Sequence, residues 1–296
     1  MNKKTVATAF AILAAALYAI NIPFSKVLMK YVDSTMMAGL LYFGAGVGMF
    51  LYTAVRGVLG KKVVKEPLTK AELPYTIAMV VLDIAAPILL MHGLKITSSA
   101  NATLLNNFEI VATSLIALVV FKEVVSKKLW IAIGLVTLAS IILTFEGVGS
   151  FSFNLGSLMV LGAATCWGFE NNCTRMLSHK SSEQIVVIKG IFSGLGSLIA
   201  AFLIGEQIPQ WIYIVAVMVL GFVSYGLSIN FYIMAQAHLG AAKTSAYYSI
   251  APFLGVAFSL ALLGERPGVQ FYVALIVLIL GTILIVSDTL NDNSVN

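Results

Sequence analysis

Apolar runs long enough to cross a lipid bilayer fill this chain and limit its fold more than any other feature. A helix of about 20 apolar residues spans a bilayer. Only 10% of the 296 residues are charged and 59% are hydrophobic, whereas soluble domains are about 25% charged. The sequence therefore predicts an all-α integral membrane protein with ten transmembrane helices, at roughly 6–28, 35–56, 74–94, 100–121, 127–146, 155–177, 183–204, 210–236, 243–263 and 268–288.

The basic residues predict the orientation of these helices. With the N-terminus in the cytoplasm, four basic residues fall on the far side, Lys26, Lys30, Lys95 and Arg266. The other 14 of the 18 Lys and Arg fall on the cytoplasmic side: Lys3, Lys4, Arg56, Lys61, Lys62, Lys65, Lys70, Lys122, Lys127, Lys128, Arg175, Lys180, Lys189 and Lys243. Such a bias places both termini in the cytoplasm. Because these residues flank apolar runs, the net charge of +5 does not indicate a nucleic-acid partner.

The chain also repeats itself. Residues 96–136 align with 238–278 without a gap, matching Ala100 with Ala242 and Glu123 with Glu265. Each half would hold five helices, and because five is odd, the second half enters the membrane inverted, as in many secondary transporters. We expect repeats at 1–148 and 149–290, followed by a disordered tail at 291–296.

Ten helices in two such halves, with the stretches "SSANATLL…FKE" and "LGAAKTSAYYSIAPFLGVAFSLALLGE", resemble the drug/metabolite transporter superfamily, in particular its EamA-type members. The resemblance covers nearly the whole chain. It implies a transporter rather than an enzyme, and export rather than import. One departure is Ile110, which stands in the fourth helix where that family commonly has a proline and where the second half has Pro252.

Three acids stand away from the predicted helix ends, where insertion of a charge costs about 2.5–3.5 kcal/mol. They are Asp83, Glu109 and Glu170. The sequence shows no Lys or Arg at comparable depth, and we interpret Lys26, Lys95 and Lys189 as topology or snorkelling residues. Buried acids without basic partners can carry protons or bind a cation.

Two mirrored motifs contain two of these acids: "NNFE" at 106–109 and "FENN" at 169–172. On the first helix, Thr103, Asn106, Glu109 and Thr113 form one polar stripe, and on the second, Glu170 lies beside Trp167 and Asn171. Polar stripes are unfavourable in lipid, so both should face one interior space. The alternative is that Asn and Thr only join helices, at about 0.6 kcal/mol per contact.

Aromatic residues complete the predicted site. Tyr247 and Tyr248 are candidates for binding an organic cation through their ring faces, together with Asp83, Asn106, Glu109, Trp167, Glu170 and Asn171. Further aromatics of the same helices are Tyr18, Phe169, Tyr225 and Tyr232. Ordinary bundle packing is the alternative for each ring. Cys166 and Cys173 flank Glu170 and could hold a soft metal, but lone membrane cysteines usually act as small hydrophobes, so we expect no metal site and no cofactor.

These patterns predict a secondary transporter of the bacterial inner membrane. It would move a small metabolite, such as an amino acid, an amine or a cationic organic compound, by alternating access and in exchange for protons or another coupling ion. No motif of a known catalytic site is present. An uncoupled facilitator or channel, and a non-transporting sensor or assembly protein, stay open as alternatives. The expected partners are the substrate, the coupling ion and the bilayer, with the protein a monomer or homodimer.

Overall fold

The computed structural model describes residues 3–58, 66–121, 127–144, 154–177, 180–239, 244 and 247–292. Across these residues the regular structure is helical, with no strand. This confirms the all-α part of the predicted fold class for the described residues.

Helices lie in every apolar run of the sequence. In chain order they are α1 (Lys3–Ala19), α2 (Asn21–Leu28), α3 (Ser34–Val58), the 3₁₀ turn η1 (Lys70–Glu72), α4 (Leu73–Ile96), α5 (Ser99–Leu105), α6 (Phe108–Phe121), α7 (Lys127–Thr144), α8 (Leu155–Leu177), α9 (Ser182–Leu203), α10 (Trp211–Gly221), the π-helical turn η2 (Phe222–Leu227), α11 (Ser228–Leu239), α13 (Ala251–Leu263) and α14 (Val269–Asp292). Because α14 continues to Asp292, residues 291–292 of the expected tail are helical, and 293–296 lie outside the described residues.

Six stretches are long and apolar enough to cross a membrane: Thr5–Leu28, Ser34–Val58, Lys70–Ile96, Ser99–Val120, Ser182–Leu203 and Trp211–Ala235. Shorter apolar helices cover Trp130–Leu143, Ala251–Leu263 and Val269–Leu284. Helix α8 has 23 residues, which is long enough to cross a membrane, but it belongs to neither of these two sets of apolar helices. Its second half carries "FENN", which makes it less apolar than its neighbours.

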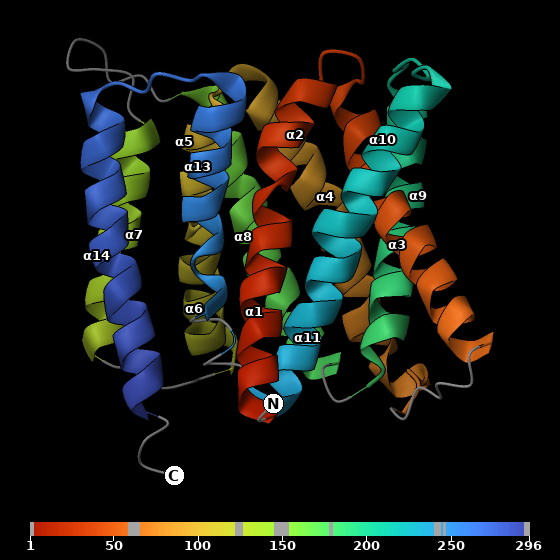
Figure 1. Cartoon of the computed structure of the whole chain (residues 1–296), viewed down its shortest axis with the longest axis horizontal. Helices are drawn as coiled ribbons and strands as arrows, with labels where there is room; N and C mark the ends of the chain where they lie inside the picture. Colours follow the sequence, from red (N-terminus) through yellow and green to blue (C-terminus); the bar gives the residue numbers. More distant parts are fainter. Residues whose placement is uncertain are drawn as a thin grey trace.

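The helices run side by side along one common direction (Figure 1). The start of α1 and the end of α14 lie at the same end of this bundle, the lower edge of the figure. Helix α7 packs on α14, α1 on α11, and α3 on α9. We call the end of the bundle that holds the start of α1 the α1 end, and the opposite end the far end.

Glycines let α3 approach its neighbours closely. A Cβ on Gly44 would lie 2.3 Å from the Met218 carbonyl oxygen of α10, and one on Gly46 would lie 2.4 Å from the Ile191 nitrogen of α9. Both distances are shorter than a Cβ allows. Small residues at such contacts allow membrane helices to pack backbone to backbone. Here they hold α3 close to α9 and α10.

Several apolar runs are broken near their middle. The first helix breaks at Ile20, between α1 and α2. The fourth breaks at 106–107, between α5 and α6, and the ninth at 249–250, just before α13. The eighth contains the π-turn η2. Interrupted helices at membrane depth free backbone polar groups, and such backbone is tolerated only where it lines protein or a cavity.

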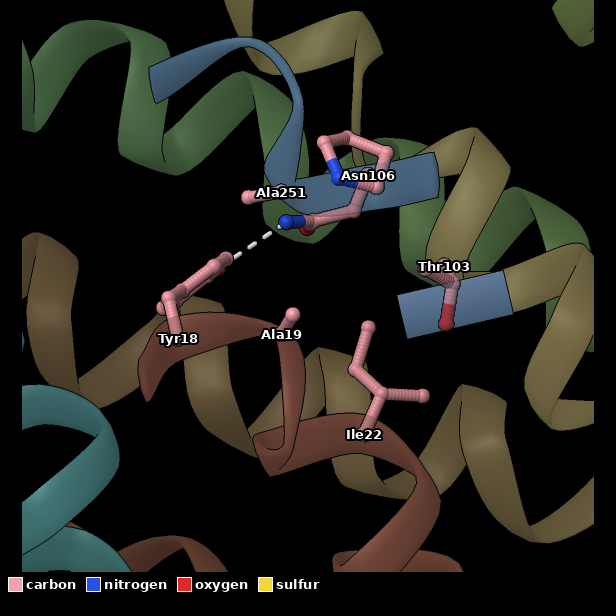
Figure 2. A pocket seen from close by; sticks show the side chains of 7 residues that line it. Tyr18, Ala19, Ile22, Thr103, Asn106 and Ala251 are labelled. Carbon is pink, nitrogen blue, oxygen red and sulfur yellow. Dashed lines mark hydrogen bonds between the residues drawn. The ribbon is translucent and has the colours of Figure 1, made fainter. Parts of the chain in front are cut away.

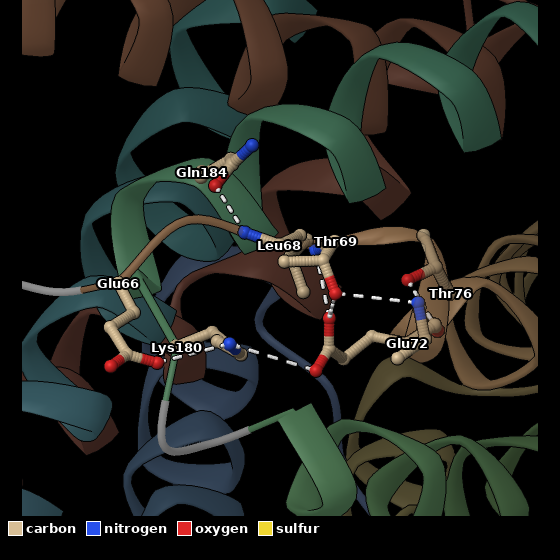
Figure 3. A network of polar contacts seen from close by, with 8 residues as sticks. Glu66, Leu68, Thr69, Glu72, Thr76, Lys180 and Gln184 are labelled. Carbon is tan, nitrogen blue, oxygen red and sulfur yellow. Dashed lines mark hydrogen bonds and ion pairs between the residues drawn. The ribbon is translucent and has the colours of Figure 1, made fainter.

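A polar network joins the connection before α4 to the connection between α8 and α9 at the α1 end (Figure 3). The Lys180 ammonium lies 3.1 Å from Glu66 Oε2 and 3.6 Å from Glu72 Oε1. Thr69 and Glu72 form a capping box at the start of η1. The hydrogen bond with Glu66, together with the charge of Glu72, raises the pKa of Lys180. This network links the segment before α4 to the segment before α9 at this end.

Candidate functional site

The most deeply buried charges form one cluster between three helices. The Lys189 ammonium of α9 lies 3.1 Å from Asp83 Oδ2 of α4 and 2.9 Å from Glu170 Oε1 of α8. Asp83 is 0% exposed, Glu170 2% and Lys189 6%. Removing charges from water is costly unless their partners compensate for the lost solvation. Here one ammonium compensates two carboxylates.

This cluster corrects two expectations from the sequence. Lys189 is not a topology or snorkelling residue, and it is the base at comparable depth that Asp83 and Glu170 were expected to lack. Lys189 lies two turns into α9, which starts at Ser182, and its side chain turns inward instead of toward the α1 end. Removing it from the expected cytoplasmic set leaves 13 basic residues there, so the charge bias persists.

Neutral hydrogen bonds hold both carboxylates in place. The Tyr42 hydroxyl donates to Asp83 Oδ1 at 2.8 Å, and the Trp167 Nε1–H donates to the Tyr42 oxygen at 3.1 Å. The Thr174 hydroxyl donates to Glu170 Oε1. Tyr42 and Trp167 are 2% and 5% exposed. The cluster is thus a connected network reaching from α3 to α9.

The third acid, Glu109, contacts α8 through the second of the two mirrored motifs. Asn171 Nδ2 donates to Glu109 Oε1 at 2.6 Å, and Asn172 Nδ2 donates to the Thr113 carbonyl at 3.2 Å. Helices α6 and α8 approach closely at Gly168, where a Cβ would lie 2.5 Å from the Ala112 Cβ. Within the described parts of the chain, no Lys or Arg forms an ion pair with Glu109.

Five tyrosines from α1, α3, η2, α11 and the segment before α13 gather into one cluster. The Tyr18 ring lies 6.0 Å from that of Tyr225 and 5.8 Å from that of Tyr248, measured between ring centroids. Tyr225 lies 4.9 Å from Tyr42, and Tyr248 lies 5.0 Å from Tyr232. We call these five residues the tyrosine cluster. Tyr42 belongs to both groups and joins the cluster to Asp83.

The helix breaks border this cluster. Asn106, at the break between α5 and α6, donates through Nδ2 to the Tyr18 hydroxyl at 2.9 Å (Figure 2). Its amide oxygen is buried, and no hydrogen bond to it is described. A cavity of about 10 Å³ lies here, lined by Tyr18, Ala19, Ile22, Thr103, Asn106, Ala251 and Pro252. That volume holds one water molecule at most, so the site is closed around this point.

The structure does not bring every candidate into this region. Asp83, Glu109, Glu170, Asn106, Asn171, Trp167 and Tyr248 take part in the contacts above. Tyr247 is half-buried, and no described contact joins it to them. Phe169 is 45% exposed, on the outside of the bundle. Among the described residues, no three His, Cys, Asp or Glu converge as metal ligands, so the cysteines beside Glu170 gain no support as a metal site.

Three members of the site escaped sequence reasoning: Lys189, Tyr42 and Asn21. Asn21 follows the break at Ile20, and its Nδ2 donates to the Tyr225 hydroxyl at 2.9 Å. Asn21 is 0% exposed. From the sequence alone, a role in the site and a role in helix packing explained this residue equally well. The available signal was position: Asn21 and Tyr42 each lie in the middle of an apolar run.

The arrangement has an excess of acid. Three carboxylates (Asp83, Glu109, Glu170) and one ammonium (Lys189) sum to a charge of −2 when all are ionised, −3 plus +1. A charge of −2 inside a bilayer is strongly unfavourable. The site can lower this cost by taking up protons or by binding a cation, and the tyrosine cluster is joined to its acids by the hydrogen bond from Tyr42 to Asp83.

Comparison with known proteins adds to this geometry. A model of the EamA-like transporter family matches residues 5–145 and again residues 154–287. A protein described as an uncharacterized transporter from Methanothermobacter thermautotrophicus is 24% identical over 293 residues, covering 93% of this chain and 84% of that protein. A crystal structure shares the fold with a TM-score of 0.67 at 17% identity, covering 94% of each chain.

Proposed function

The chain belongs to the EamA-like transporter family, and from that premise we propose that it exports a small organic cation in exchange for protons. The family match makes it a multi-pass membrane transporter. The substrate class, the coupling ion and the direction are our proposals.

One observation carries the proposal: the excess of carboxylate at the centre of the bundle. Glu109 has an amide partner but no described basic partner, while Lys189 neutralises one charge of the Asp83 and Glu170 pair. The protein therefore needs positive charge from outside its own sequence at some point of its cycle. Protons and an organic cation both supply it, and the two would compete for the same carboxylates.

The neighbouring groups favour an amine or another organic cation as the substrate. The ring faces of Tyr18, Tyr225 and Tyr248 attract cations. The Glu109 nitrogen donates to the Asn106 carbonyl at 3.1 Å, so this acid stands close to the residue that contacts the Tyr18 hydroxyl. The unpaired Asn106 oxygen can accept a hydrogen bond from an ammonium group. An amine would thus meet an acid, an acceptor and ring faces at one place.

Alternating access fits the organisation of the helices. The repeat alignment places residues 106–107 opposite 248–249, one residue from the observed break at 249–250. Paired helix breaks next to a central site are a feature of inverted-repeat transporters. The family model matches each half of the chain separately, which supports repeats at 1–148 and 149–290. We take ten spanning helices as the working count.

The orientation follows the charge bias. The α1 end carries most of the basic residues, and we place it, with both termini, in the cytoplasm of a bacterial inner membrane. Glu170 and Lys189 lie on the α1 side of their helices, about two turns from the ends of α8 and α9. In this orientation, protons entering down their gradient would drive a cation outward.

Flux in proteoliposomes tests this function. The purified protein is reconstituted with a pH-sensitive dye inside, and a panel of amines, amino acids and quaternary ammonium compounds is added outside under an imposed pH gradient. We expect saturable movement of at least one amine, accompanied by proton movement in the opposite direction. Liposomes with the Glu109→Gln protein serve as the matched control.

The alternatives give other results. An uncoupled facilitator would move the compound without moving protons. A sensor or assembly protein would show no flux with any compound, although it could still bind one. Either result would overturn proton-coupled export, and saturable flux restricted to neutral or anionic compounds would overturn the substrate class.

A further inference from the structure

A second cavity lies at the far end of the bundle, away from the tyrosine cluster. Its volume is about 320 Å³, and it is lined by Lys26, Met29, Lys30, Lys95, Leu263 and Glu265. These residues come from α2 and the two residues after it, from the end of α4, and from the end of α13 and the segment after it. Three lysines, two of them four residues apart in the sequence and the third from the end of α4, thus line one space.

The single acid of this cavity is already engaged. Glu265 accepts from the Ser99 nitrogen at 2.8 Å and from the Ala100 nitrogen at 2.9 Å, one carboxylate oxygen for each. Lys26 donates to the Thr97 carbonyl at 2.6 Å and to the Leu94 carbonyl. Glu265 and Lys26 therefore hold the turn between α4 and α5 in place from two sides.

The other two lysines remain available. Lys30 and Lys95 are exposed, and among the described residues neither forms an ion pair. Counting three lysines and one glutamate, the cavity carries a charge of +2, from +3 and −1. Lysine is a common phosphate ligand because its ammonium acts as a compact point charge.

The position of these lysines argues against a general topological role. Basic residues concentrate at the α1 end, and only Lys26, Lys30, Lys95 and Arg266 were expected at the far end. Three of these four line the same cavity. Lysines that only snorkel to lipid headgroups would be spread around the bundle. Their convergence indicates a shared anionic ligand.

We infer that this cavity binds a phosphate group carried by an organic molecule, with Lys30 and Lys95 as its main ligands. The cavity is far larger than the roughly 30 Å³ that one water molecule occupies, so it has room for a phosphate and its attached body. Met29 and Leu263 give that body an apolar wall. Helix ends lie at the depth of lipid headgroups, so the phosphate comes from a phospholipid or from a soluble organic phosphate.

The test compares two probes on purified protein in a neutral detergent. One probe is phosphatidylglycerol, and the other is soluble glycerol phosphate. Thermal unfolding is followed at increasing probe concentration for the wild type, for Lys30→Gln/Lys95→Gln, and for Lys127→Gln/Lys128→Gln. The last variant removes the same charge from exposed positions at the start of α7, at the other end of the bundle.

We expect at least one probe to stabilise the wild type and the Lys127→Gln/Lys128→Gln variant alike. The Lys30→Gln/Lys95→Gln variant should bind about 30-fold more weakly, since each lysine near a membrane surface adds about fivefold to the affinity. Stabilisation by phosphatidylglycerol alone identifies a lipid, and stabilisation by both probes identifies a site open to soluble phosphates. Lys26 is left unchanged because it holds carbonyl groups of the fold.

Two results would overturn the inference: no stabilisation of the wild type by either probe, or equal affinity in the two double variants. Because the readout is binding, it does not depend on transport, and loss of this site would leave the proposed function of the tyrosine cluster untouched.

Discussion

Lys189 lies 2.9 Å from Glu170. Glu170 stands about two helical turns before the end of α8, and Lys189 about two turns after the start of α9. Both side chains point into the bundle, where Lys189 also meets Asp83 at 3.1 Å. The protein thus carries its own cation at the place where three acids gather. One ammonium does not neutralise three carboxylates, and the proposed proton-coupled export rests on this excess of acid.

Replacing Lys189 with Met should destabilise the protein strongly. The change removes the ammonium while keeping much of the side-chain volume, and it leaves Asp83 and Glu170 facing each other without a cation. Breaking a buried pair in this way costs about 3–5 kcal/mol. The melting temperature in detergent at neutral pH should fall well below that of Lys128→Met, which changes an exposed residue.

Acid should partly rescue the Lys189→Met protein. Protonation of Asp83 removes its repulsion with Glu170, so the loss of stability relative to the wild type should shrink as the pH falls. A melting temperature equal to that of Lys128→Met at neutral pH would show that the ion cluster does not support the fold.

Glu109→Gln should abolish coupling but leave the fold intact. The Gln oxygen can still accept from Asn171, so the contact between α6 and α8 persists, while the group no longer ionises. We expect proton-coupled flux to fall at least about tenfold, as loss of a positioned acid–base group usually costs 10² or more. Glu66→Gln, whose side chain is 80% exposed, serves as the control. If Glu109→Gln kept the wild-type flux, Glu109 would have no part in coupling and would only join α6 to α8.

Tyr248→Leu should weaken binding of an organic cation, and Tyr248→Phe should preserve it. Phe keeps the ring face toward Tyr18, whereas Leu removes it. A cation–π contact contributes about 0.5–2 kcal/mol, or about 2- to 30-fold in Kd. Tyr31→Leu is a suitable control, because Tyr31 stacks on Tyr213 and is 55% exposed. Equal affinity in the Leu and Phe variants would exclude the ring from the binding site.

The close packing of α3 predicts opposite effects for two glycines of that helix. Gly44→Ala would place a methyl group 2.3 Å from the Met218 carbonyl and force α3 away from α10, at a cost of about 1–3 kcal/mol or more. Gly57→Ala meets nothing within 4 Å and should raise stability slightly, by less than the ~0.5–1 kcal/mol of a mid-helix position, because Gly57 stands one residue from the end of α3. Thermal unfolding of both variants checks the pair, and similar melting temperatures would contradict the close approach.

Much of the fold could be predicted from the sequence, because hydropathy alone locates helices in a bilayer. Helix α8 was expected at 155–177 and is found at Leu155–Leu177. The internal breaks could not be predicted in the same way. The break at 106–107 has no proline, and the sequence of α5 and α6 continues an apolar helical pattern through it. The sequence around 106–107 does not differ from that of a continuous α-helix. What marks the break is contact with other helices, such as the hydrogen bond between Asn106 and Tyr18.

The acids of the candidate site could be predicted from the sequence, but the residues that pair with them could not. A carboxylate inside an apolar run is easily recognised, so Asp83, Glu109 and Glu170 could be identified from their positions in the sequence. Lys189 lies close enough to a helix end to pass for a topology residue, and helical periodicity does not say which faces of two helices meet. Tyr42 and Asn21 are uncharged and common in membrane helices, so their role depends on neighbours that only the folded chain provides.

The central claim is that protons and an organic cation compete for the same buried carboxylates. It is tested most directly by adding a transported amine to the detergent-purified protein in weakly buffered solution and measuring the protons released at saturation. We predict release of about one proton or more per cation bound, reduced in Glu109→Gln and unchanged in Glu66→Gln. Saturable binding of the amine with no proton release at any pH would contradict the account.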